Sequence, residues 1–134
     1  MTKIKFRFEW FNEQKTGLHL IAEADWNWRD YHAGARAAAF NTISLNHPVT
    51  MLLDFSQHSR ATMPAGVAAH AQTFGKAITP NLDGNAIVIG LTNDDLAKIP
   101  REENGTLPTK DGTVYFVDDV DTAREVLAQL HSDR

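Results

Sequence analysis

Apolar and polar residues alternate in the first two predicted elements. In IKFRFEWF, residues 4–11, every second side chain is apolar as far as Trp10, which is the period of a strand with one exposed face. The alternation returns in LHLIAEA, residues 18–24, after the polar turn sequence NEQKTG. We therefore predict two strands that pair as an antiparallel hairpin.

Two later stretches are apolar with little interruption. VTMLLDF, residues 49–55, and AIVIGLT, residues 86–92, carry too few polar side chains for one face to meet solvent. We expect both to be adjacent central strands, buried on both faces, with Asp54 at the exposed end of the first. TVYFVD, residues 113–118, supplies the last strand.

The first predicted helix has a well-marked start in DWNWRDY, residues 25–31. Asn27 is placed to cap it, Asp30 stands three residues later, and Trp26 and Tyr31 occupy the two positions of a hydrophobic staple. We interpret the tryptophans as packing residues and not as a ligand-stacking site. The helix is expected to end before Pro48, with an inward stripe of Tyr31, Ala35, Ala38 and Leu45.

Three further helices are expected after the later strands. The second covers residues 64–78, with Pro64 in its first turn and an inward stripe of Val67, Ala71, Phe74 and Ile78. A short third helix lies within residues 93–100, and the polar segment 101–112 is expected to be a mobile loop. The last helix is capped by Asp119 and faces inward through Val120, Ala123, Leu127 and Leu130.

This element order, β-β-α-β-α-β-α-β-α, predicts an α/β fold. The helices between strands imply right-handed crossovers, a mostly parallel sheet with helices packed on it, and one antiparallel edge strand. A chain of 134 residues suits one domain over residues 1–134.

Composition narrows the range of partners. The net charge of −4 and the absence of a basic stripe oppose binding to nucleic acid. The chain has no cysteine, which excludes disulfides and thiolate chemistry and suits a reducing compartment. No stretch reaches the roughly 20 apolar residues of a membrane span, and the N-terminal stretch does not resemble a signal peptide, so a cytoplasmic location is expected.

The strongest candidate for chemistry is the loop after the first central strand. Asp54, His58 and Ser59 are the residue types of a hydrolase triad, but all three stand within one loop and no nucleophile elbow is present, so no catalytic residue is predicted. None of the histidines is spaced as a helical metal ligand, although folding could bring two together. No phosphate-binding glycine motif occurs, and neither a metal nor a cofactor is predicted.

A recognition surface remains as the interpretation of this loop. Parallel sheets bind partners beyond the carboxyl ends of their strands, which here means residues 55–66, the segment after Leu91, and the turn at residues 118–119. The residues predicted to bind a partner are Asp54, Ser56, His58, Ser59, Arg60 and Thr62.

The motifs DWNWRDY, HPVTMLLDF, MPAG and VYFVDDVDTAREVL together resemble the SpoIIAA-like, or STAS, group, in its stand-alone members of unknown function. The resemblance covers nearly the whole chain. It implies a regulatory domain of the anti-sigma-factor-antagonist type whose partner is a protein such as an anti-sigma-factor kinase. The phosphorylatable serine of that group corresponds here to a position near Met63 or Pro64, so the usual serine is absent.

The sequence therefore predicts a non-enzymatic domain that binds a protein partner. The alternative is a domain that binds a lipid-like or nucleotide ligand, in which case a cavity is expected beneath residues 93–112. An enzyme is the third class. The oligomeric state and the phosphorylation of Ser56, Ser59 or Thr62 stay open at this point.

Overall fold

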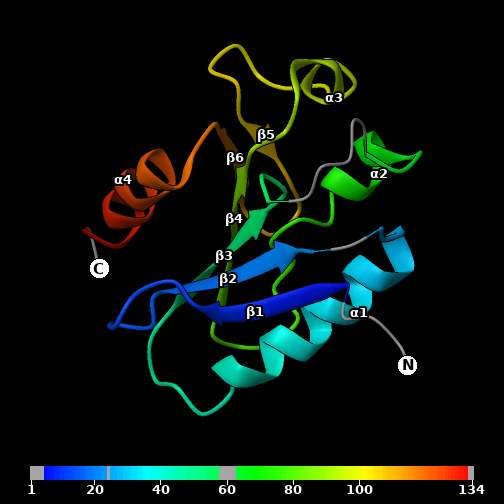
Figure 1. Ribbon diagram of the computed structural model, residues 1–134. Coiled ribbons are helices and arrows are strands. Elements are labelled where there is room, and N and C mark those ends of the chain that lie inside the picture. The colour runs from blue at the N-terminus through cyan, green and yellow to red at the C-terminus, as the bar shows by residue number, and fades with distance from the viewer. Residues whose placement is uncertain (1–4, 24, 58–62, 133–134) are drawn as a thin grey trace.

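The computed structural model describes residues 5–23, 25–57 and 63–132. It contains a six-stranded sheet in the order β1-β2-β3-β4-β6-β5, with helices on both faces (Figure 1). The strands are β1 (Phe6–Trp10), β2 (Gly17–Ala22), β3 (Val49–Asp54), β4 (Leu82–Ile89), β5 (Leu107–Pro108) and β6 (Thr113–Val117). The helices are α1 (Trp28–Ala39), α2 (Val67–Ala71), α3 (Asn93–Ala97) and α4 (Val120–Ser132), and a short 3-10 turn, η1 (Phe40–Thr42), follows α1.

Strands β2, β3, β4 and β6 are mutually parallel, and the predicted hairpin of β1 and β2 is confirmed. The prediction of a single antiparallel edge strand is wrong, because β5 pairs antiparallel with β6 at the opposite edge. Strand β5 lies inside the segment predicted to be a mobile loop. The strand forms there because the Leu107 side chain is buried opposite Val114.

The two apolar stretches form adjacent central strands, as predicted. Every residue of β3 is buried, and β4 lies beside it in the sheet. The expected exposure of Asp54 is wrong: the side chain ends β3 but is fully buried, with a relative exposure of 0%. A carboxyl group in that position must be paired, since an unpaired buried charge is strongly unfavourable.

Helix α1 begins as predicted and ends earlier than predicted. Asn27 accepts a hydrogen bond from the amide of Asp30, whose carboxylate accepts one from the amide of Asn27, which completes a capping box. Trp26 and Tyr31 are buried, which confirms their packing role, and both meet the ring of Phe6 edge-on. The helix stops at Ala39 and tightens into η1, so the stripe ends before Leu45.

Helix α2 is much shorter than the predicted span of 64–78. Gly66 precedes it with φ of 94°, and Gly75 has φ of 74°, a backbone conformation that interrupts a right-handed helix. A Cβ atom on Gly75 would lie 2.7 Å from the Asn85 carbonyl, so the chain also needs glycine for this close approach to β4. Pro64 therefore precedes the helix, and Ile78 is 43% exposed instead of facing inward.

The core has two parts, one on each face of the sheet. The larger packs α1, α2 and Ile99 against one face, and the smaller packs Ala123 and Leu127 of α4 against Leu52, Ile87 and Ile89 on the other. Figure 1 shows α1 and α4 on opposite sides of the sheet. Asp119 caps α4 by accepting from the amide of Thr122, as predicted. No helix among the described residues is long and apolar enough to cross a membrane.

Candidate functional site

The Asp54 carboxylate lies where the parallel strands have their carboxyl ends, which we call the carboxyl edge of the sheet. It accepts hydrogen bonds from several groups there. The Ser56 amide and hydroxyl both donate to its Oδ1, at 2.9 and 2.5 Å. His19 Nε2 of the neighbouring strand lies 2.9 Å from Oδ2, and the Gln57 side-chain amide donates to the same oxygen at 3.4 Å. The carboxylate thus fixes the first residues of the loop to the end of β3.

These contacts also set the charge of Asp54. Burial alone raises its pKa, but the hydrogen bonds from His19 and Ser56 together outweigh burial, so the pKa of Asp54 lies below its ordinary value. The group is therefore a carboxylate at neutral pH and accepts hydrogen bonds without donating one.

The arrangement of His19, Asp54 and Ser56 differs from a catalytic triad. In a triad the histidine lies between the acid and the hydroxyl nucleophile. Here the Ser56 hydroxyl donates to Asp54 itself, and the His19 ring packs edge-on against Phe11. Four of the predicted partner-binding residues, His58, Ser59, Arg60 and Thr62, lie outside the described residues.

The far end of the same loop is anchored by a second buried carboxylate. Asp95 of α3 is 2% exposed and accepts a hydrogen bond from the Met63 amide, at 3.3 and 3.2 Å from its two oxygens. Thr92, the cap of α3, donates its hydroxyl to Asp95 at 3.1 Å. The Trp28 indole donates to the Ala65 carbonyl at 2.8 Å, which ties the loop to α1 as well.

Exposed acidic side chains lie in two other turns at this end of the sheet. Asp94 at the start of α3 is exposed, as are Asp118 and Asp119 in the turn between β6 and α4. The turns that carry them follow the parallel strands β4 and β6, so they lie at the same edge of the sheet as Asp54. We name Ser56, Gln57, Asp94, Asp118 and Asp119 the carboxyl-edge surface.

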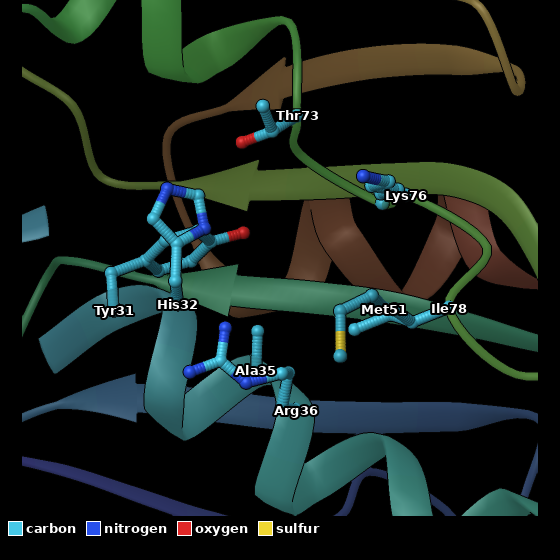
Figure 2. Close-up of a pocket in the computed structure, with 9 residues that line it drawn as sticks. Tyr31, His32, Ala35, Arg36, Met51, Thr73, Lys76 and Ile78 are labelled. Atoms are coloured by element: carbon cyan, nitrogen blue, oxygen red, sulfur yellow. The ribbon is translucent and has the colours of Figure 1, made fainter. Parts of the chain in front are cut away.

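A separate cavity of about 250 Å³ lies between α1 and the segment that follows α2, which we name the α1 cavity (Figure 2). None of its walls comes from residues 93–112, where the ligand-binding alternative places a cavity. Its lining residues are Tyr31, His32, Ala35, Arg36, Met51, Thr73, Gly75, Lys76 and Ile78.

At this cavity, folding brings together two histidines from different helices. His32 Nε2 lies 2.9 Å from His70 Nδ1, and the His70 ring stacks on Trp28 with the ring centres 4.4 Å apart. Burial, followed by the positive charges of His70, Arg36 and Lys76, lowers the pKa of His32. This site was not predicted from the sequence, although His32 and Arg36 stand four residues apart on one helical face.

A third polar cluster joins the sheet to the end of α4. The Thr50 hydroxyl donates to Asp83 at 2.5 Å and lies 2.8 Å from His131 Nε2. Thr50 is fully buried, so its hydroxyl is not an accessible nucleophile. Among the residues that the structure describes, no group of three or more histidine, cysteine, aspartate or glutamate side chains is arranged to hold a metal ion.

The chain matches no protein-family model, and searches among curated proteins and among solved structures found no match. The function must therefore be inferred from the geometry of its own residues.

Proposed function

We propose that this chain is a non-enzymatic regulatory domain of STAS-like architecture that binds a protein partner through the carboxyl-edge surface. The observation that carries the proposal is the anchoring of one loop at both ends by buried carboxylates. Asp54 holds Ser56, and Asp95 holds Met63. A loop held in this way loses less conformational entropy when a partner binds, because its ends are already ordered.

The use of Asp54 as an anchor argues for binding and against catalysis. Its carboxylate is occupied by donors from Ser56, Gln57 and His19. Among the described residues no histidine forms a hydrogen bond with the Ser56 hydroxyl, which donates to Asp54 instead, so these residues form no activated nucleophile at this position.

The exposed charges indicate the chemistry of the partner. The exposed carboxylates of Asp94, Asp118 and Asp119 favour a partner with a basic patch. The resemblance to the STAS group supports a partner related to anti-sigma-factor kinases, which meet that family at the corresponding loop.

The test begins with cross-linked capture from a native lysate, followed by affinity measurement with the purified partner. We expect Asp94→Asn and Asp118→Asn each to weaken binding and to reduce its salt dependence, because each removes one negative charge from the surface. Glu13→Gln is the matched control, since Glu13 is exposed in the β1–β2 turn at the opposite edge of the sheet.

The loop itself is tested by alanine at Ser56, His58, Ser59, Arg60 and Thr62 together. We expect this variant to fold and to lose the partner. The proposed surface would be refuted if the variant with all five alanines bound the partner as tightly as wild type. It would also be refuted if Glu13→Gln weakened binding as much as Asp94→Asn or Asp118→Asn. Intact-mass analysis of the native protein shows whether a phosphate is attached to the chain.

A further inference from the structure

The α1 cavity has positively charged side chains on opposite walls. Arg36 extends from α1, and Lys76 extends from the segment after α2. In the parts of the chain that the structure describes, no carboxylate forms an ion pair with Arg36 or Lys76. Two acids on neighbouring segments have other partners: Asp30 caps α1, and Asp111 accepts from the Ala77 amide at 3.0 Å.

A buried hydroxyl also faces this space. Tyr31 is 2% exposed, and its hydroxyl has no hydrogen-bond partner among residues 5–23, 25–57 and 63–132. Figure 2 shows the hydroxyl directed into the cavity, toward the space between Thr73 and Arg36. A buried donor without a partner costs free energy, and a ligand oxygen at that point would remove this cost.

Polar atoms of Thr73 complete this side of the cavity. The Thr73 hydroxyl donates to the His70 carbonyl at 2.6 Å, so its oxygen keeps the capacity to accept from a ligand hydroxyl. The opposite side is apolar and consists of Ala35, Met51 and Ile78 (Figure 2). Arg36, Lys76 and Ile78 are exposed, which leaves the cavity open to solvent.

We propose that the α1 cavity binds a small phosphate monoester, with the phosphate between Arg36, Lys76 and Tyr31 and the organic group against Met51 and Ile78. A phosphate fits better than a carboxylate because it offers three terminal oxygens and nearly two negative charges to donors that arrive from different directions. His32, when protonated, adds a further donor on the same side. None of the carboxyl-edge surface residues lines this cavity, so the proposal stands or fails separately from the proposed function.

Isothermal titration calorimetry with phenyl phosphate, inorganic phosphate and benzoate tests the ligand class. We expect phenyl phosphate to bind most tightly and benzoate most weakly. Arg36→Gln and Lys76→Gln should each weaken phenyl phosphate binding about tenfold, and Tyr31→Phe severalfold, as the loss of a hydrogen bond to a charged group implies. Arg29→Gln is the matched control, because Arg29 is an exposed arginine of α1 that does not line the cavity.

A flotation assay distinguishes a free ester from a lipid headgroup. Phosphatidylcholine vesicles with and without phosphatidic acid are compared, since phosphatidic acid carries the same phosphate monoester. Binding to the phosphatidic acid vesicles that depends on Arg36 and Lys76 identifies the lipid as the source, and binding to phenyl phosphate alone identifies a free metabolite.

The outcomes separate clearly. Thermal melts first establish that each variant folds, and Tyr31→Phe keeps the ring and therefore the packing. The proposal is overturned if wild type binds none of the phosphate probes, if benzoate binds as tightly as phenyl phosphate, or if Arg29→Gln weakens binding as much as Arg36→Gln.

Discussion

His32 Nε2 and His70 Nδ1 lie 2.9 Å apart, which leaves room for only one hydrogen between the two nitrogens. One ring must therefore be the donor and the other a neutral acceptor. Full protonation of both rings would place two N–H groups against each other beside Arg36 and Lys76. The pair is thus stable in the folded protein only while at least one histidine is uncharged.

The first prediction follows from the lowered pKa of His32. The unfolded chain binds this proton near the ordinary pKa of 6.5, whereas the folded protein binds it only at lower pH. Stability from neutral His32 is therefore fully present above pH 6.5 and is lost as pH falls through the lowered pKa of the folded state. Urea unfolding measured across this pH range should show a smaller decline of the unfolding free energy in His32→Gln than in wild type. Equal declines in the two proteins would contradict the prediction.

The second prediction concerns Asp54. Because its carboxylate is buried and serves Ser56, Gln57 and His19, Asp54→Ala should cost about 3–5 kcal/mol of unfolding free energy. Asp54→Asn should cost less, since the amide oxygen still accepts from Ser56. Chemical denaturation measures both costs. Asp118→Ala, which removes an exposed carboxylate at the same edge, is the control and should change the unfolding free energy by no more than about 0.5 kcal/mol. If Asp54→Ala left the free energy of unfolding unchanged, these hydrogen bonds would contribute little to stability.

The third prediction tests the start of α1. Asn27→Ala should destabilise the protein by about 1 kcal/mol, because the amide of Asp30 loses its acceptor. Trp26→Ala should cost more, about 3–5 kcal/mol, through loss of contacts with Phe6 and with Phe55, on which it stacks. Thermal melts compare the two variants, and a milder effect of the tryptophan change would argue against its packing role.

The fourth prediction separates steric crowding from backbone strain at two glycines. Gly90 and Gly105 have nearly equal φ angles of 83° and 84°. A Cβ on Gly90 would lie 2.6 Å from Ser56 Cβ, whereas one on Gly105 would meet only the Arg101 guanidinium at 3.9 Å. Gly105→Ala should cost about 1 kcal/mol and Gly90→Ala clearly more, as measured by denaturation. Equal costs would mean that the Ser56 contact can relax.

Much of the fold was predictable because its strongest patterns are local. The hairpin, the two central strands and the cap at Asn27 all follow from residues adjacent in sequence. The end of α2 was not predictable in the same way. The apolar stripe continues to Ile78, and the need for glycine at position 75 arises from the Asn85 backbone ten residues later. Strand β5 was missed because two residues are too few to show a period.

The candidate sites were less predictable, since they depend on contacts between distant residues. The position of Asp54 at the end of a central strand was correct, but its burial depends on His19 of another strand. The His32–His70 contact joins two helices that no local pattern relates. For the α1 cavity the sequence offered only one indication, the four-residue spacing of His32 and Arg36.

The cluster of Thr50, Asp83 and His131 has a practical consequence for interaction measurements. It fixes the last turn of α4 near the start of β3 and β4, at the opposite edge of the sheet from Asp54. A biotin acceptor peptide fused after α4 would therefore tether the molecule to a sensor chip with Asp94 and Asp118 directed toward the flowing analyte. An amino-terminal fusion would instead join the chain ahead of β1, whose first residue pairs with Ala22 at the same edge as Asp54, and would crowd the carboxyl-edge surface.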